Sequence, residues 1–451
     1  MKNTFSRYSI YFVLLVTAAF ILTSKNWNND NKIIASDVVS YYAYLPAAFI
    51  FNDIKLERQE TFDKGLFWPE KLPDGNSVIK TSMGMSILYS PFFFASHFAA
   101  KSFGLDAYGY SPVYKIGLLL SAFFYFFMGL YFLQKTLKRY FSDKITALTI
   151  IAVTLGTNLL YYATSEATMT HVYNFTLINI FIWLTIKWYE KPKFPGLMIL
   201  GLLAGLITLV RPSNIIVLVF FFLYGISSKD TFIQRLRFVF SRLHWFVLMA
   251  VAFTLVWIPQ MIYWWSITGK IFVNSYPTER FYWGNPHIIK GLFSYRKGWL
   301  VYTPVMILAV IGIPFLFKKL KEFSWAIIVF ILLAMYIIFS WWCWWYGGSF
   351  GMRPFVDYYG VLAIPMALLF SELPAKKRYS KIIGVSLVLL AMVQSTFFMQ
   401  KYKKGSLHYD STSKSSFWHS FLHTNPQNGY WELLEKPDYK KALEGVDAIE
   451  K

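Results

Sequence analysis

The sequence has 451 residues, of which 56% are hydrophobic and only 15% are charged. Soluble domains carry about 25% charged residues, so the composition excludes a soluble protein and indicates a membrane protein, in agreement with the mean hydropathy of +0.41. Lys and Arg outnumber Asp and Glu by 44 to 24. They fall in short clusters between apolar runs, which is typical of cytoplasmic loops and not of a nucleic-acid-binding surface.

The chain starts with a basic segment and an apolar run from Ile10 to Leu22. A cleaved signal peptide has a similar pattern, but no clear small-x-small cleavage site follows the run. We therefore expect an uncleaved first helix. The lone cysteine, Cys343, excludes a disulfide framework or a thiolate metal cluster within the chain.

A membrane span needs roughly 20 apolar residues, and fewer where neighbouring helices cover its ends. On this basis the sequence predicts an all-α polytopic membrane protein with about eleven transmembrane helices. Residues 211–212 could alternatively lie within one broken helix instead of between two spans. The expected spans lie near residues 8–24, 114–134, 145–163, 172–189, 196–211, 213–226, 244–263, 300–317, 324–340, 358–373 and 381–399.

Residues 82–100 are also apolar, but they include a proline and a histidine. We expect them to form a helix on the outer surface, because this choice places the loops rich in Lys and Arg inside. The same rule predicts a multi-pass protein of the cytoplasmic (inner) membrane, with the N-terminus inside and the C-terminus outside. A transmembrane domain would cover residues 1–400, with surface helices in the first outer loop (25–113), and a short outer tail would cover 401–451.

An acidic residue, Asp37, follows the first span and precedes a stretch rich in apolar and aromatic residues. One interpretation is a helix cap, since Ser36 and Asp37 stand directly before an apolar run. The other is a catalytic carboxylate at the membrane surface. Both can hold, because the N-terminus of a helix stabilises a negative charge. Tyr41, in the same stretch, is a candidate substrate-binding residue.

Two arginines stand out in the short outer loops. Arg211 and Arg353 each precede a proline beside the end of a span. A planar guanidinium can donate two parallel hydrogen bonds to a phosphate, so both are candidate binding residues, and snorkelling to lipid headgroups is the alternative. The glycines of residues 347–351 would let backbone N–H groups approach an anion, although they equally allow a tight turn.

Further polar residues on the outer side carry weaker signals. Arg296 and Lys297 precede the span near residue 300 and suit an anionic headgroup, and an ordinary aromatic belt with basic anchors looks the same. Glu166 and His171 lie in a short outer loop. With Asp37 they could form a site for a divalent cation, and an unliganded polar loop is the other interpretation.

These features resemble the GT-C superfamily of membrane glycosyltransferases, in particular its protein O-mannosyltransferase and lipid A aminoarabinose transferase branches. The resemblance covers roughly residues 1–400. Its motifs are Asp37 in the first outer loop, the apolar helix led by Lys80, the segment that ends in Arg211-Pro212, and residues 345–351 with Arg353 and Asp357 after them.

Two departures from the family pattern concern the site. The stretch after Lys80 resembles a Lys-Pro-Pro-Leu stretch of the aminoarabinose branch, but it lacks the prolines. Many members also carry a second acidic residue beside the first, where this chain has Val38. If the reaction needs two carboxylates or a metal, Glu166 or Asp53 would have to serve.

The resemblance implies transfer of a sugar from a polyprenyl-phosphate-linked donor to a lipid, glycan or protein acceptor on the outer face. Asp37 would act as the general base, which must lie within hydrogen-bond reach of the acceptor proton. The lipid phosphate would be held by cations that stabilise its charge as it leaves. The expected substrate-binding residues are Lys80, Arg211, Arg296, Arg353, Tyr41 and His171.

Two other classes of protein stay open on the sequence. A lipid or polysaccharide transporter, such as a flippase, would explain the spans and the outer cations, but it needs no outer carboxylate and should line its spans with polar residues. A non-catalytic envelope scaffold makes no demand on Asp37. The sequence contains neither a GxxxxGK[ST] loop nor an HExxH helix.

Overall fold

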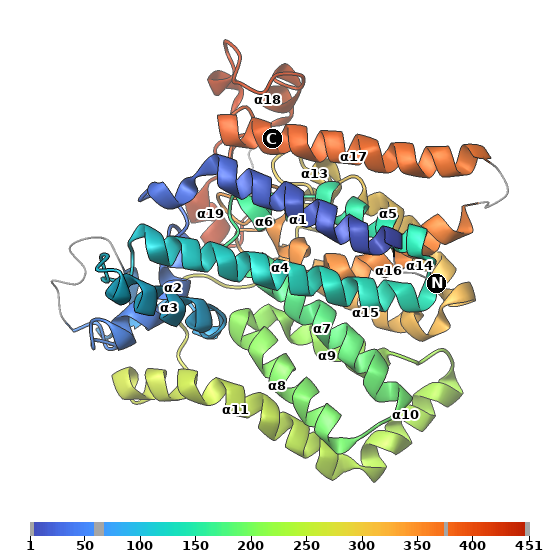
Figure 1. The fold of residues 1–451 in the computed structure, drawn as a ribbon, viewed down its shortest axis with the longest axis horizontal. Coiled ribbons are helices and arrows are strands. Elements are labelled where there is room, and N and C mark those ends of the chain that lie inside the picture. The colour runs from blue at the N-terminus through green and yellow to red at the C-terminus, as the bar shows by residue number, and fades with distance from the viewer. Residues whose placement is uncertain (1–3, 58–66, 374–377, 447–451) are drawn as a thin grey trace.

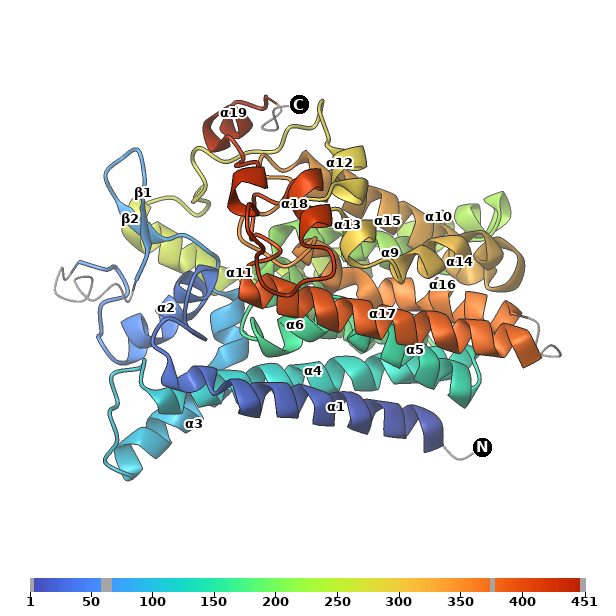
Figure 2. The ribbon, with the colours of Figure 1, turned by 90° about the horizontal axis from the view of Figure 1, so that it is seen from above.

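The structure, a computed structural model, describes residues 4–57, 67–373 and 378–446. The long helices form a bundle, and many of the shorter elements gather at the end opposite to the N-terminus (Figures 1 and 2). The helices of the bundle are α1 (Thr4–Ser24), α4 (Pro112–Tyr140), α5 (Asp143–Leu155), α7 (Thr170–Glu190), α8 (Phe194–Val210), α9 (Val217–Leu223), α11 (Leu243–Thr268), α14 (Met306–Lys319), α15 (Lys321–Ser340), α16 (Tyr359–Glu372) and α17 (Arg378–Lys404).

The shorter elements connect these helices or follow them. One antiparallel hairpin, β1–β2, pairs Pro69 with Ile79. The elements are η1 (Asn26–Asn28), α2 (Asp37–Phe49), β1 (Pro69–Lys71), β2 (Ser77–Ile79), α3 (Gly84–Ser102), α6 (Leu159–Thr164), η3 (Pro212–Ile216), α10 (Lys229–Ser241), α12 (Ile288–Phe293), α13 (Trp299–Tyr302), η4 (Arg353–Tyr358), α18 (Lys414–His419), η5 (Trp431–Leu433) and α19 (Tyr439–Leu443).

The helices confirm the all-α polytopic membrane fold predicted from the sequence. Each predicted span overlaps one or more helices, and in the described part of the chain 6 helical segments are long and apolar enough to cross a membrane. The segments Phe194–Val210 and Pro212–Leu223 are apolar but shorter. The 6 long segments are Thr4–Asn28, Pro112–Tyr140, Leu243–Thr268, Lys321–Ser340, Arg353–Glu372 and Ile382–Lys404.

The predicted span near residues 145–163 is divided into α5 and α6. The chain leaves the helix at Gly156, and the side chain of Asn158 turns into the bundle. There its amide donates to the carbonyl of Phe350 (3.1 Å), and its side-chain oxygen accepts from the hydroxyl of Tyr359 (2.7 Å). The break therefore lets Asn158 hold the loop at Phe350 in place. The same loop forms part of the candidate site described below.

Prolines mark two further breaks, because a proline has no N–H to donate to a helix. Pro304 separates α13 from α14, and Pro212 begins η3 after α8. Beyond η3, α9 runs back towards the start of α8. The ring of Phe221 lies 5.4 Å from that of Trp188, whose indole N–H donates to the carbonyl of Lys193 just before α8. The helices α8 and α9 are therefore two segments and not one broken helix.

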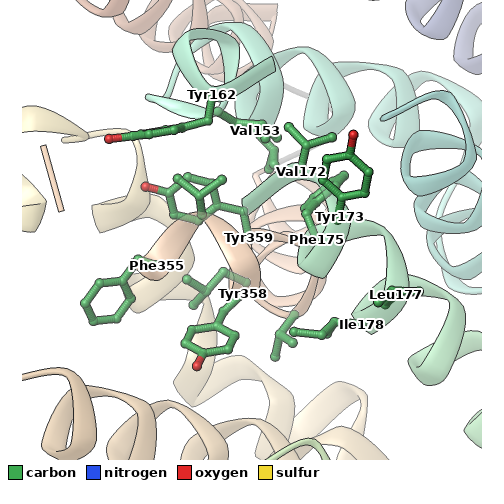
Figure 3. Packing of buried hydrophobic residues seen from close by; sticks show 14 of the residues in the cluster. Val153, Tyr162, Val172, Tyr173, Phe175, Leu177, Ile178, Phe355, Tyr358 and Tyr359 are labelled. Carbon is green, nitrogen blue, oxygen red and sulfur yellow. The ribbon is translucent and has the colours of Figure 1, made fainter. Parts of the chain in front are cut away.

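The centre of the bundle is formed by α7 and α16. The most apolar part of the segment Arg353–Glu372 is 89% buried, whereas the corresponding parts of α11 and α1 are 17% and 28% buried. Figure 3 shows side chains of this centre, among them Tyr162 of α6, Tyr173 of α7 and Tyr359 of α16. The peripheral helices thus keep apolar faces for lipid.

Glycines bring elements together where a larger residue would not fit. A Cβ on Gly312 of α14 would lie 2.0 Å from the carbonyl oxygen of Pro365 in α16. A Cβ on Gly84, at the start of α3, would lie 2.4 Å from the backbone nitrogen of Val210 at the end of α8. Small residues at helix contacts allow the close packing that holds membrane helices together. The second contact docks α3 against the bundle.

The surface helices and the predicted inner loops lie at opposite ends of the bundle. Helices α2 and α3 lie at the end away from the N-terminus (Figure 2). At the N-terminal end, the backbone N–H of Phe5 donates to Asp143 (2.8 Å), and Arg139 forms an ion pair with Glu190. These contacts gather the N-terminus and the predicted inner loops after α4 and α7 at one end.

Candidate active site

A cavity of about 790 Å³ lies at the end of the bundle that carries α2. Its walls come from the end of α1, the start of α2, the connection between α6 and α7, the segment 341–353, the end of α17 and the C-terminal tail. The residues that line it are Ser24, Asn26, Asn31, Lys32, Ile33, Ala35, Ser36, Asp37, Val38, Tyr161, Ser165, Glu166, Thr168, Met169, Glu279, Trp341, Trp342, Cys343, Tyr346, Gly347, Gly348, Arg353, Tyr402, Lys403 and Tyr439.

Asp37 is the first residue of α2 and faces this cavity. Its Oδ2 lies 3.2 Å from Nη1 of Arg353, with the side chain of Asp37 43% exposed and that of Arg353 18% exposed. Ser36 stands at the N-cap but makes no side-chain capping hydrogen bond. The capping interpretation of Ser36 and Asp37 is therefore not supported, and the aspartate pairs with an arginine instead.

The backbone that leads to Asp37 is strained. Ile33 and Ser36 have φ angles of 70° and 52°, which residues with a Cβ rarely adopt. Such conformations cost on the order of 1–3 kcal/mol each and collect at functional sites. Here they set the direction in which the chain enters α2, and so they place the Asp37 carboxylate at the cavity.

The glycine-rich loop before Arg353 forms another part of the cavity wall. Gly347 and Gly351 have φ angles of 58° and 62°, so the turn needs glycine at these positions. The ammonium of Lys297 donates to the carbonyl of Ser349 from behind the loop, and burial lowers the pKa of Lys297 to about 7. The backbone N–H of Arg353 donates to the carbonyl of Gly351 (3.0 Å). The loop thus holds Arg353 in place.

Residues 347–351 also match the G-x-S-x-G pattern of serine hydrolases. Ser349 is buried, however, and its hydroxyl donates to the carbonyl of Gly351 (3.2 Å). A hydrolase nucleophile would be exposed at the top of a strand-to-helix turn. Ser349 is therefore a structural residue of the loop.

Glu166 brings a second carboxylate to the cavity. The hydroxyl of Tyr161 donates to its Oε1 (2.9 Å). Burial raises the pKa of the Glu166 carboxyl, and the positive charge of Arg353 acts against this rise. Of the two residues considered for a second carboxylate, Glu166 lines the cavity, whereas Asp53 accepts from the backbone N–H of Glu57 (2.9 Å) and does not line it.

The structure does not gather Asp37, Glu166 and His171 into one cation site. His171 is buried, and its Nδ1 lies 2.8 Å from Oδ1 of Asp357. Within the described residues, no group of three or more His, Cys, Asp or Glu side chains could hold a metal ion. The predicted trio fails because His171 points into the bundle, while the two carboxylates face the cavity.

Asp357 is the centre of a buried polar network beneath the cavity. Its two oxygens accept from His171 and from the amides of Asn174 (3.1 Å) and Asn214 (3.0 Å). Arg211 adds an ion pair at 3.6 Å. Removing one partner of a buried charge costs on the order of 3–5 kcal/mol. The network therefore ties α7, η3 and η4 together at the floor of the site.

Arg211 lies one layer behind the cavity wall. Its guanidinium is 5.7 Å from the ring centroid of Tyr346, and that ring lines the cavity. The side chain of Arg211 is 20% exposed. The structure thus brings Arg211 near the cavity, but it does not place it among the lining residues.

Lys80 and Tyr41 lie beside the cavity. The ammonium of Lys80 is 2.7 Å from Oε1 of Glu279, and the other oxygen of Glu279 accepts from the indole N–H of Trp342 (2.9 Å). Tyr41 follows Asp37 by one helical turn, so both lie on the same face of α2. Burial raises the pKa of Tyr41 and keeps its hydroxyl neutral.

Arg296 is not brought to the cavity. Its guanidinium donates to the carbonyls of Asp410 and Glu435 (2.9 Å for Glu435), so it fastens the C-terminal tail to the segment before α13. The tail in turn supplies Tyr439 to the cavity wall, where its ring lies 6.2 Å from that of Trp342. Arg296 therefore acts on the cavity through the tail.

Several lining residues were not singled out from the sequence. Glu279 lies in a long outer segment without a motif, and the tail gave no expectation for Tyr439. Lys32 and Lys403 belong to ordinary basic flanks of spans. All four lie in segments that the sequence places on the outer side of the membrane or at its edge, and this shared position was the signal available. These residues meet only once the chain is folded.

Comparison with known proteins supports the fold. No protein-family model matches the chain, and no curated protein sequence matches it. The crystal structure of the oligosaccharyltransferase of Archaeoglobus fulgidus, in the apo form, is similar with a TM-score of 0.51 and 11% sequence identity. The similarity covers 95% of this chain and 62% of the archaeal chain. At this identity the similarity shows the fold alone, and it agrees with the all-α polytopic membrane fold that the sequence predicted.

Proposed function

We propose that this protein is a membrane glycosyltransferase that moves a sugar from a polyprenyl-phosphate-linked donor to an acceptor on the outer face of the cytoplasmic membrane. The observation that carries the proposal is the pair of Asp37 and Arg353, which lies in a cavity at one end of a membrane bundle. The GT-C-like fold, shared with an oligosaccharyltransferase, supports the same reaction class.

The chemistry assigns one role to each member of this pair. Asp37 accepts the proton of the acceptor hydroxyl or amine as that group attacks the anomeric carbon of the sugar. A new bond forms to this carbon, and the bond from the carbon to the phosphate oxygen breaks, so that the electron pair leaves on the phosphate. Arg353 stabilises this developing negative charge with donors that are already in position. Arg211 adds positive charge from behind the wall.

The other residues of the site shape the cavity. Tyr41 supplies a neutral hydroxyl one turn along α2 from the base. The rings of Trp342 and Tyr439 offer flat apolar surfaces for a sugar. Glu279 holds Lys80 at the cavity margin. The lipid phosphate is the leaving group, so the reaction needs no nucleotide site.

A divalent cation fits part of this arrangement. Asp37 and Glu166 face the same cavity, and Mg²⁺ is commonly held by one or two carboxylates together with substrate phosphates. When bound, such an ion would help to neutralise the charge of the leaving phosphate. The two carboxylates are the residues of this chain that would hold it.

The Asp357 network favours an enzyme over a transporter. A transporter should line a path through its spans with polar residues. Here the polar groups around Asp357 are buried and bonded to one another beneath the cavity. They stabilise the floor of a site that opens at one end.

Transfer can be measured with the purified protein in liposomes that contain a polyprenyl-phosphate sugar labelled in the sugar. We expect the protein to move the label from the lipid to an acceptor, or slowly to water, and to release polyprenyl phosphate. A fluorescent analogue of the same donor reports translocation in a parallel sample. Translocation of an intact donor, with no release of sugar from any donor offered, would favour the transporter and overturn the proposal.

A further inference from the structure

The charges that line the cavity are not evenly paired. Asp37 faces Arg353 at 3.2 Å, and Glu279 faces Lys80 at 2.7 Å. Lys32 and Lys403 also line the cavity, and in the described part of the chain neither has a carboxylate within 4.0 Å. Among the described residues these two ammonium groups therefore form no ion pair, and Glu166, the remaining carboxylate of the cavity wall, accepts from Tyr161 instead.

These two lysines come from different parts of the chain. Lys32 lies in the connection from α1 to α2, and Lys403 lies in the last turn of α17. Both line the same cavity, where like charges repel each other. Holding like charges together is unfavourable, and an anion between them would remove this cost.

The last turn of α17 shows that Lys403 differs from its neighbours. Lys401 is buried and donates to the carbonyls of Ser420 and Phe421 in the tail (3.0 Å for Phe421). Lys404 lies 3.5 Å from the hydroxyl of Thr424. Lys403 instead lies over the ring of Phe20 of α1, at 5.7 Å, and faces the cavity. Tail contacts hold two of the three lysines, and the third points to the site.

The helices α1 and α17, next to these lysines, expose apolar side chains as lipid-facing helices do. The most apolar parts of α1 and α17 are only 28% and 33% buried, compared with 89% at the centre of the bundle. Leu15 of α1 and Val393 of α17 are 68% and 69% exposed. An anion that reaches Lys32 and Lys403 from this side therefore arrives on a lipid.

We propose that Lys32 and Lys403 bind the phosphate of the polyprenyl-phosphate donor, whose chain lies against the apolar outer ends of α1 and α17. This proposal rests on the proposed function and adds the site at which the donor is recognised. Lysine binds phosphate as a point charge. The phosphodiester of the donor carries one negative charge, and the phosphate monoester released when the sugar leaves carries about two, which the two lysines match. Arg353, already paired with Asp37, is then left to act on the oxygen that departs from the sugar.

The test is a binding measurement with the full-length protein in phosphatidylcholine nanodiscs and farnesyl phosphate as the probe. The variants are Lys32→Gln, Lys403→Gln and the double variant, and Lys404→Gln is the matched control from the same helical turn. We expect each single variant to weaken binding roughly 5- to 10-fold and the double variant about 50-fold, since 1.4 kcal/mol is a factor of ten. The control should bind as the wild type does.

Several outcomes would overturn the proposal. Wild-type affinity in the double variant would do so, and so would an equal loss in Lys404→Gln, which would indicate a general surface charge effect. Competition by phosphatidylglycerol as strong as that by farnesyl phosphate would indicate an ordinary headgroup site. Farnesol lacks the phosphate, so its affinity should be the same for the wild type and for all of the variants.

The binding test does not depend on transfer. If no donor supports transfer while farnesyl phosphate still binds through both lysines, the proposed function fails and the phosphate site stands. If the wild type transfers sugar and the double variant does so at the same rate and donor concentration, the phosphate site fails and the proposed function stands.

Discussion

Asp37, at the start of α2, and Arg353, at the start of η4, lie far apart in the sequence, and their side chains meet at 3.2 Å in the cavity. Neither residue is fixed by this ion pair alone. Strained backbone at Ser36 directs Asp37, and a tethered glycine-rich loop directs Arg353. A pair that both sides of the site hold in place is suited to act in a reaction, because preorganised charges need not rearrange in the transition state.

Arg353→Lys tests the geometry of this pair. Lysine keeps the charge but loses the planar fork, so transfer should fall on the order of 10-fold with insertion unchanged. Arg353→Ala also removes the charge and should cost on the order of 10²–10³-fold, as loss of a transition-state donor does elsewhere. Initial rates of sugar release give both values. Wild-type rates in both variants would instead support snorkelling to lipid headgroups.

Glu166→Gln tests the effect of burial on a carboxyl of the cavity. The folded protein raises the pKa of Glu166 above its usual 4.5. The folded state therefore holds this proton more tightly, and stability is lost as the pH rises from 4.5 through the raised pKa. Glutamine cannot ionise but still accepts from Tyr161. The variant should therefore melt at a higher temperature than the wild type at pH 8.

The difference in melting temperature should shrink near pH 4, where Glu166 is mostly protonated in both states of the wild type. Glu432→Gln, at an exposed position of the tail, is the control and should follow the wild type at both pH values. Melting curves in detergent at pH 4 and pH 8 measure the difference. A lower melting temperature for Glu166→Gln at pH 8 would show that the ionised carboxylate stabilises the fold.

Arg296→Ala should release the C-terminal tail. Hydrogen bonds to a charged group contribute about 1.5–3 kcal/mol, so loss of the contacts to Asp410 and Glu435 should make opening of the tail about 10- to 100-fold more frequent. Limited chymotrypsin digestion should then cut within residues 405–446, while the exposed Arg237→Ala control stays intact. Transfer should also fall, because Tyr439 leaves the cavity wall. An intact tail in Arg296→Ala would contradict this account of Arg296.

The predicted topology can be tested with single cysteines. Cys343 is 5% exposed, and its replacement by alanine gives a background without thiols. A membrane-impermeant maleimide added from outside should label cysteines placed within 264–299 and in the tail after Lys401, but not within 227–243. Labelling of the loop 135–144 from outside would overturn the assignment of residues 82–100 to a surface helix.

The sequence predicted the fold better than the site. Apolar runs mark helices directly, so the positions of the long helices were predicted. A break such as that at Asn158 was missed, because its polar side chain is satisfied by Phe350 and Tyr359, far away in the sequence. The same limit applies to Asp357, which was noted beside Arg353 but whose partners come from two other segments. Local patterns identify charged residues, and the fold decides which of them face a cavity.

The arginines show the same limit in another form. Arg211 and Arg353 had similar signals in the sequence and Arg296 a weaker one, and each is a cation beside a helix end that was predicted to lie outside. In the structure Arg353 lines the cavity, Arg211 supports its floor and Arg296 fastens the tail. Arg353 pairs with a carboxylate of the cavity, Arg211 with a buried carboxylate, and Arg296 with two backbone carbonyls. The sequence does not reveal these partners.

Asp37→Asn tests the central assignment. Asparagine is nearly isosteric with aspartate and is also tolerated at the start of a helix, so the variant should insert and fold as the wild type does. It cannot accept a proton usefully at neutral pH, and loss of a general base typically costs on the order of 10²–10⁴-fold in rate. The initial rate of sugar transfer from a polyprenyl-phosphate donor measures this loss, while farnesyl phosphate binding through Lys32 and Lys403 should persist. Asp30→Asn, at a carboxylate whose partner is Lys115 outside the cavity, is the matched control and should keep its rate. A folded Asp37→Asn protein with near-normal transfer would leave Asp37 as a structural partner of Arg353, and the general-base role would have to be given to another residue.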